Sequence, residues 1–98
     1  MTEEQDPRQR AIALLESQHA FPGEFEFRVV IRPPAKAAVL GAVLAVTGGS
    51  GSLVDVTERP STNGNYVALR IRTRVAAATG VLDAYEILRG VEGVLTIL

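Results

Sequence analysis

The chain has 98 residues with ten Lys or Arg, eleven Asp or Glu and no Cys, so its formal net charge is −1. This length suits one domain with its own core. The small net charge excludes a whole-molecule electric field that would attract nucleic acid or an anionic membrane. The lack of cysteine excludes disulfides and cysteine metal ligands. No apolar run approaches the ~20 residues that span a bilayer, and the acidic opening lacks the basic start of a secretory signal, so we expect a cytoplasmic protein with no membrane contact.

Residues 1–20 predict a polar tail and a short amphipathic helix outside the main domain. Asp6 is suited to the N-cap and Pro7 to the first helical position. Helical spacing places four apolar residues on one face: Ala11, Ile12, Leu14 and Leu15. This face needs an apolar surface to cover it. Pro22-Gly23 then signals a turn, so residues 21–98 are expected to form the folded domain.

Six elements are predicted in residues 21–98, in the order strand, helix, strand, strand, helix, strand. They are expected at residues 24–32, 35–47, 53–59, 67–74, 76–89 and 91–98. The first and fourth elements alternate apolar and polar residues, which is typical of strands buried on one face. Their inward side chains, expected to form the centre of the core, are Phe25, Phe27, Val29, Val67, Leu69 and Ile71. In residues 53–59 we expect Val54 and Val56 to face inward.

The βαββαβ order predicts an α+β, ferredoxin-like fold with an extra N-terminal helix. This fold has one antiparallel four-stranded sheet with two helices on one face. Right-handed crossovers would place the first and third strands centrally and the other two at the edges. The dipeptide Asn63-Gly64 between the second and third strands predicts a tight hairpin of the primed type.

The uncovered face of this sheet is predicted to carry most of the basic residues. Strand parity assigns six arginines to it: Arg28, Arg32, Arg59, Arg70, Arg72 and Arg74. They form either a solvated face with cross-strand Glu–Arg pairs or a binding surface for a protein partner or an anionic small ligand. Nucleic-acid binding is less favoured, because only Tyr66 offers an aromatic ring there. Val94, Thr96 and Leu98 would add apolar area to this face. We therefore expect either a homodimer formed through the sheet or an N-terminal helix that lies across exposed sheet or helix surface.

No pattern indicates an enzyme, a metal site or a cofactor site. His19 is the sole histidine, and without cysteine it cannot build a recognisable metal centre or a catalytic triad. A phosphate-binding loop has a lysine and leads into a helix N-terminus. The Gly48–Ser52 run contains no lysine, follows a helix and leads into a strand. We interpret His19 as a helix end and the glycine run as a connector.

Four stretches carry a resemblance to a known family. They are Leu14-Leu15-Glu16, Phe21-Pro22-Gly23-Glu24-Phe25, Ser61-Thr62-Asn63-Gly64-Asn65-Tyr66 and Tyr85-Glu86-Ile87-Leu88. Over about residues 12–98 the chain resembles the YbeD-like family of small bacterial proteins of unknown function. The resemblance implies an ACT-like fold, and some family descriptions propose a regulatory role in lipoate metabolism. The most family-specific stretch is the turn, and the role of Ser61, Asn63, Gly64, Asn65 and Tyr66 is either structural or functional.

The sequence therefore predicts a small non-enzymatic regulatory or interaction protein. One alternative is an ACT-type small-ligand sensor, and a second is a nucleic-acid-binding module. Amino-acid-binding ACT domains keep a glycine in the loop after the first strand, so that backbone amides can approach the ligand. Here that loop is Arg32-Pro33-Pro34-Ala35, in which two prolines remove two backbone donors.

Overall fold

A computed structural model describes residues 6–98 and has the expected α+β architecture. The elements follow in the order α1 (Pro7–Gln18), β1 (Gly23–Ile31), the 3-10 turn η1 (Pro33–Ala35), α2 (Lys36–Thr47), the 3-10 turn η2 (Ser50–Ser52), β2 (Leu53–Pro60), β3 (Val67–Val75), α3 (Ala78–Arg89) and β4 (Val94–Ile97). The tail expected before α1 lies outside the described residues, apart from its last position. There Asp6 accepts a 2.8 Å hydrogen bond from the Arg8 N–H and caps α1, as predicted.

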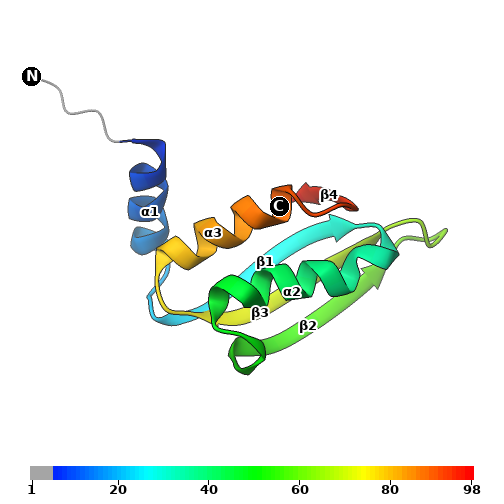
Figure 1. Ribbon diagram of the computed structural model, residues 1–98, viewed down its shortest axis with the longest axis horizontal. Helices are drawn as coiled ribbons and strands as arrows, with labels where there is room; N and C mark the ends of the chain where they lie inside the picture. Colours follow the sequence, from blue (N-terminus) through cyan, green and yellow to red (C-terminus); the bar gives the residue numbers. More distant parts are fainter. Residues whose placement is uncertain (1–5) are drawn as a thin grey trace, which may run out of the picture.

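One antiparallel sheet of four strands forms a layer, in the order β2-β3-β1-β4. β1 and β3 are central and pair over nine positions, from Gly23 opposite Val75 to Ile31 opposite Val67. α2 and α3 lie side by side on one face of this sheet (Figure 1). The ferredoxin-like arrangement with an additional N-terminal helix is therefore confirmed.

The core lies between the sheet and its two covering helices. All six central side chains expected inward on β1 and β3 are buried. The helices add Val39 and Val43 from α2 and Val81, Ala84 and Leu88 from α3. In α3 the small Ala84 is fully buried, whereas the larger Leu82 is only half-buried. The small alanine permits close approach of α3 to the layer beneath it.

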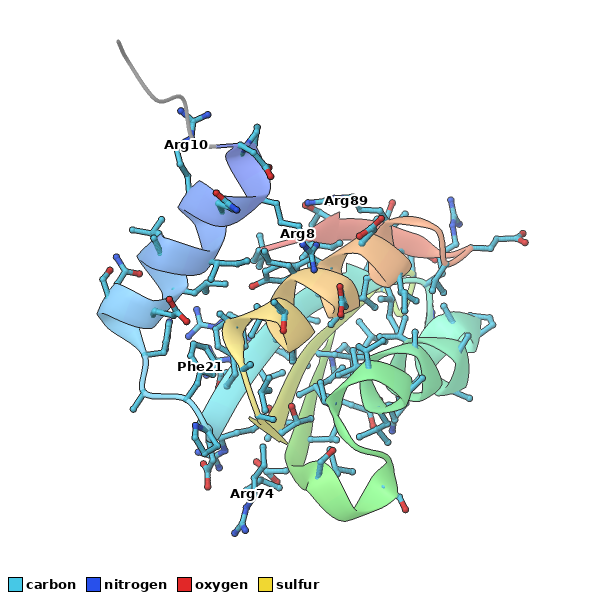
Figure 2. The ribbon with its side chains drawn as sticks, turned by 60° about the vertical axis from the view of Figure 1, so that its left-hand side comes forward. Arg8, Arg10, Phe21, Arg74 and Arg89 are labelled. Carbon is cyan, nitrogen blue, oxygen red and sulfur yellow. The ribbon has the colours of Figure 1, made fainter. Side chains whose placement is uncertain are left out.

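α1 packs against α3 at the end of the domain rather than across the open face of the sheet (Figures 1 and 2). The Arg8 guanidinium reaches from α1 to Asp83, with 2.8 Å between Nη2 and Oδ1, and lies 3.9 Å from a Glu86 carboxylate oxygen. Ile12 and Leu15 are half-buried, whereas the expectation that Leu14 is covered is wrong, because it is 59% exposed. α1 therefore leaves the open face uncovered.

The edge strands differ from their expected parity because each contains an irregularity. In β2 the register shifts between Leu53 and Asp55, so Val54 lies at the bulge and is exposed instead of facing inward. In β4 the register shifts beside Ile31, which pairs with Val94. Val94 therefore shares the helix-covered side with Ile31, and its assignment to the open face is wrong. Thr96, opposite Val30, does lie on that face.

The β2–β3 hairpin is not of the primed type. Its last strand pair is Pro60 with Val67, and the Ser61 N–H then donates to the Tyr66 carbonyl at 2.8 Å. The Gly64 N–H donates to the Ser61 carbonyl at 3.0 Å. Gly64 has φ +76°, but no non-glycine residue among positions 6–98 has positive φ, so Asn63 lacks the left-handed conformation of a primed turn. A four-residue loop with one left-handed glycine closes the hairpin.

Two helices begin later than the sequence pattern indicated. Pro33 and Pro34 form the 3-10 turn η1 before α2. Proline fits the first turn of a helix, but it has no backbone N–H to donate a helical hydrogen bond. α3 begins at Ala78, after Val75 has ended β3. α2 ends as predicted at Gly48, whose φ of 114° gives the left-handed cap.

Candidate functional site: the open face of the sheet

The open face is the side of the sheet opposite α2 and α3, and it carries five of the six arginines assigned to it. Arg28 comes from β1, Arg59 from β2, and Arg70, Arg72 and Arg74 from β3. Arg74 lies at the far end of β3, opposite Glu24, and extends away from the body of the domain (Figure 2). Three carboxylates share this face, namely Glu24, Glu26 and Asp55.

Arg32 is the exception, and its placement on the open face is wrong. β1 ends at Ile31, and Arg32 leads into η1. Its N–H donates to the Gly93 carbonyl at 2.8 Å, and it lines a hollow with Pro34, Ala35 and Glu92 at the end of the domain. Side chains alternate between the two faces of a sheet only within a strand. Because β1 ends at Ile31, this alternation does not determine the side of Arg32.

One half of the open face carries its ion pairs, and we call it the paired half: Glu24, Glu26, Asp55 and Arg72, with Arg28 at the border to the other half. The Arg72 guanidinium lies 3.8 Å from a Glu24 oxygen and 3.7 Å from an Asp55 oxygen. The Glu26 carboxylate accepts a 2.8 Å hydrogen bond from Arg28 Nε. The contacts of Arg72 confirm the expected cross-strand pairs in this part of the sheet. The Glu26–Arg28 pair lies within β1.

The pKa of the Glu26 carboxyl group reflects the positive charges around it. Its pKa is held below the ordinary value, chiefly by the hydrogen bond from Arg28. Desolvation opposes this lowering of the pKa, and the charges of Arg28, Arg70 and Arg72 favour the ionised form. Arg70 thus acts on Glu26 through space and is not its direct partner.

The other half, which we call the basic half, is formed by Val30, Arg59, Ala68, Arg70 and Leu98. No carboxylate lies within ion-pair distance of Arg59 or Arg70 among residues 6–98. Glu58, the neighbour of Arg59 in the chain, forms an ion pair with Lys36 on the helix side. Arg70 stands directly opposite Arg28, an arrangement of like charges that costs stability.

Two adjoining hollows run over the basic half. One has a volume of about 460 Å³ and is lined by Arg28, Arg59, Ala68, Arg70 and Leu98 among others. The second, of about 320 Å³, lies toward the hairpin and is lined by Val30, Arg59, Pro60, Ser61, Tyr66 and Ala68. Arg59 and Ala68 border both, so together they form one groove. The groove exists where the small side chain of Ala68 stands between larger neighbours.

The family-specific turn borders this groove at one end. Ser61 Oγ accepts a 3.0 Å hydrogen bond from the Tyr66 N–H and lies 3.4 Å from the Asn63 side-chain oxygen. Ser61 and Gly64 therefore shape the loop, and the Tyr66 side chain, 45% exposed, stands at the rim of the hollow. The turn and the arginines are separate features of the sequence, and the fold brings Ser61, Tyr66 and Arg59 together around one hollow.

The loop after β1 leaves no backbone N–H free to bind a ligand. Arg32 donates to Gly93, Ala35 donates to Arg32, and Lys36 donates to Pro33, while Pro33 and Pro34 have no N–H. The hollow beside this loop has a volume of about 410 Å³. Its backbone therefore lacks the donors by which an ACT-type loop would hold a small anion.

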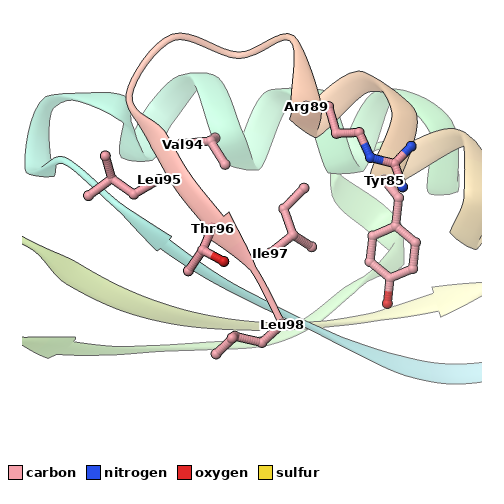
Figure 3. Close-up of a pocket in the computed structure, with 7 residues that line it drawn as sticks. All are labelled: Tyr85, Arg89, Val94, Leu95, Thr96, Ile97 and Leu98. Atoms are coloured by element: carbon pink, nitrogen blue, oxygen red, sulfur yellow. The ribbon is translucent and has the colours of Figure 1, made fainter.

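A third groove, of about 550 Å³, lies at the β4 edge under α3 (Figure 3). Tyr85 and Arg89 overhang it from α3, and β4 supplies the remaining lining. Burial raises the pKa of the Tyr85 hydroxyl. The groove gives access to the outer edge of β4, which has no neighbouring strand on that side among residues 6–98.

The remaining sequence features have structural places. The His19 N–H caps the end of α1 on the Leu15 carbonyl at 2.8 Å, and its ring lies 5.0 Å from that of Phe25. Within residues 6–98 no group of His, Cys, Asp or Glu is arranged to hold a metal ion. No helix in the described part of the chain is long and apolar enough to cross a membrane.

The fold and this face together define a small ferredoxin-like α+β domain with an open, arginine-bearing sheet. Residues 16–98 match a family model described as "Protein of unknown function (DUF493)", and the chain belongs to that family. DUF493 is the family of the YbeD-like proteins indicated by the sequence resemblance. No curated protein and no solved structure matches the chain.

Proposed function

We propose that this protein is a small non-enzymatic regulatory protein that works by binding a negatively charged protein partner on the open face of its sheet. The observation that carries the proposal is the contrast between the two halves of the face. The carboxylates of the paired half lie in ion pairs with Arg28 and Arg72, whereas Arg59 and Arg70 stand beside a groove without a carboxylate partner. Clustered unpaired cations at an exposed concave surface favour recognition of an acidic surface.

An ACT-type sensor of a small ligand, the alternative indicated by the resemblance, has weaker support. The backbone N–H groups of the loop after β1 already donate to carbonyl groups of the protein itself. A regulatory role in lipoate metabolism rests on the resemblance alone, because no residue described above recognises a particular metabolite.

The test is affinity purification from native lysate, with the wild-type protein compared with the double variant Arg59→Glu/Arg70→Glu. The matched control is Arg10→Glu, which makes one such charge change on exposed α1. We expect a partner that is retained by the wild type and by the control but lost by the double variant. A partner retained equally by all three proteins would contradict the use of this face.

A further inference from the structure

We propose that the occupant of the groove over the basic half is an acidic amphipathic α-helix of a partner protein. This inference rests on the proposed function and specifies the shape and chemistry of the partner. It follows from the charge of the groove, its apolar floor and the hydrogen-bonding state of the strands beneath it.

The charge of the groove calls for carboxylates. Five arginines and three carboxylates lie on the open face, so it carries a net charge of about +2 although the whole chain carries −1. Three arginines of this face have no ion pair within residues 6–98, and of these Arg59 and Arg70 border the groove, whereas Arg74 lies at the far end of β3. Arg70 also faces Arg28 across the ladder. A carboxylate placed between these guanidinium groups would relieve their repulsion and form charge-assisted hydrogen bonds.

The floor of the groove calls for apolar side chains between those carboxylates. Val30 and Ala68 face each other across the central strands, Leu98 at one end is 72% exposed, and Tyr66 stands at the other. An occupant with charged side chains alone would leave this apolar floor exposed to water. An occupant with an apolar stripe flanked by acidic residues matches both features of the groove.

The strands beneath the groove call for a helix rather than an extended peptide. An extended segment binds to a sheet by pairing with an edge, where backbone groups are free. The floor is provided by β1 and β3, which are central and already paired on both sides. The occupant must therefore satisfy its own backbone, as a helix does. A helix about 10–12 Å wide covers a strip of neighbouring strands spaced about 4.8 Å apart.

Other occupants fit the same features less well. A second copy would bring two faces of the same positive charge together, which is repulsive. A small molecule would be poorly enclosed by hollows that open along the surface of the sheet. Single-stranded nucleic acid needs stacking platforms, and Tyr66 is the one aromatic side chain in the lining.

The experiment is a titration of the full ¹⁵N-labelled chain with synthetic helical peptides. The test peptide carries leucines at i, i+4 and i+7 with glutamates on both flanks. One control peptide has the same composition in an order that gives no apolar stripe, and a second has lysine in place of glutamate. We expect amide shifts at residues 57–59, 68–70 and 96–98, with at least tenfold tighter binding of the test peptide than of either control.

Variants of the protein complete the design. Arg59→Glu/Arg70→Glu should weaken binding of the test peptide at least tenfold, and Arg59→Ala/Arg70→Ala should weaken it less. Arg10→Glu should leave binding unchanged. Circular dichroism identifies any variant that fails to fold, and the alanine pair keeps the comparison informative in that case.

Three results would overturn the inference. Equal binding of the rearranged peptide would show that the groove recognises charge without an apolar stripe. Self-association that is abolished by Arg59→Glu/Arg70→Glu would identify a second copy as the occupant. Tighter binding of a uridine 12-mer than of the test peptide would identify nucleic acid. If a lysate partner is lost with the double variant but the helical peptide fails to bind, the face is functional and only the helix is wrong.

Discussion

Thr73 shows how a single residue can oppose the environment in which it is buried. It lies on the helix-covered side of β3 with no exposed surface, opposite Phe25 and Leu53. Its hydroxyl is the one fully buried side-chain polar atom without a hydrogen-bond partner among residues 6–98. Thr47 and Ser52, the other buried hydroxyl side chains, form hydrogen bonds. An unsatisfied buried hydroxyl costs about 1–3 kcal/mol.

Thr73→Val should therefore raise the free energy of unfolding by about 1 kcal/mol, because valine has a similar shape without the unsatisfied group. Thr47→Val is the matched control and should destabilise, since Thr47 Oγ1 donates to the Val43 carbonyl at 2.9 Å. Urea denaturation of both variants measures the two changes. A lower denaturation midpoint for Thr73→Val would show that its hydroxyl is satisfied in solution.

The glycine before β4 is required by close packing as well as by backbone conformation. Gly93 has φ +93°, and a Cβ added there would lie 2.7 Å from the Ala35 Cβ. Gly93→Ala should destabilise the protein by at least the roughly 1–3 kcal/mol that such backbone strain costs. Gly41→Ala in α2 meets nothing within 4 Å and should stabilise by about 0.5–1 kcal/mol. Thermal unfolding distinguishes the two, and equal midpoints would contradict the packing at Gly93.

At the scale of the elements, β1 and β3 set the charge pattern of the open face. Neighbouring positions of the two strands bring Glu24, Glu26 and Arg72 together at one end and Arg28 and Arg70 at the other. The paired half and the basic half therefore follow from strand register. A register one residue different would exchange the two faces of a strand.

The ion pair on β1 predicts a change in stability at acid pH. The folded pKa of Glu26 is lowered, so its stabilising contribution is present at neutral pH and is lost as pH falls below the ordinary glutamate value of about 4.3. Glu26→Gln should remove part of this acid sensitivity, because the residue no longer ionises. Urea midpoints from pH 7 to pH 3 measure it. Identical pH profiles for wild type and variant would show that Arg28 does not hold the carboxylate in solution.

At the scale of the whole molecule, the two edges of the sheet are protected to different degrees. β2 contains Asp55, Glu58, Arg59, Pro60 and a bulge, all of which discourage pairing with another strand. β4 is Val94-Leu95-Thr96-Ile97, without charge or proline, beside the groove under α3. We propose that the homodimer expected from the sequence forms by pairing of β4 with β4 of a second copy.

Light scattering at high micromolar concentration tests this assembly. The wild type and Val54→Lys, which changes the β2 edge, should be dimers. Leu95→Lys should be a monomer, because the charge would be placed at the new strand pair. A monomeric wild type, or a dimer that persists in Leu95→Lys, would contradict pairing through β4.

The class of fold and the centre of the core were predictable from the order of residues along the chain. Alternation in residues 24–32 and 67–74 identified the central strands, because a strand buried on one face imposes a period of two on its residues. Helical spacing and the Gly48 exit identified α2 in the same way. These signals are local, so one chain is enough to reveal them.

Which arginines lie together without a partner, and which lie in ion pairs, depends on the packing of the strands in space. The bulge that exposed Val54, the shift that turned Val94 toward the helices and the end of β1 before Arg32 all depend on pairing between distant segments. The same pairing gave Arg72 two carboxylate neighbours and left Arg59 and Arg70 beside the groove. Charge compensation and concavity are properties of neighbours in space, and the order of residues along the chain does not specify them.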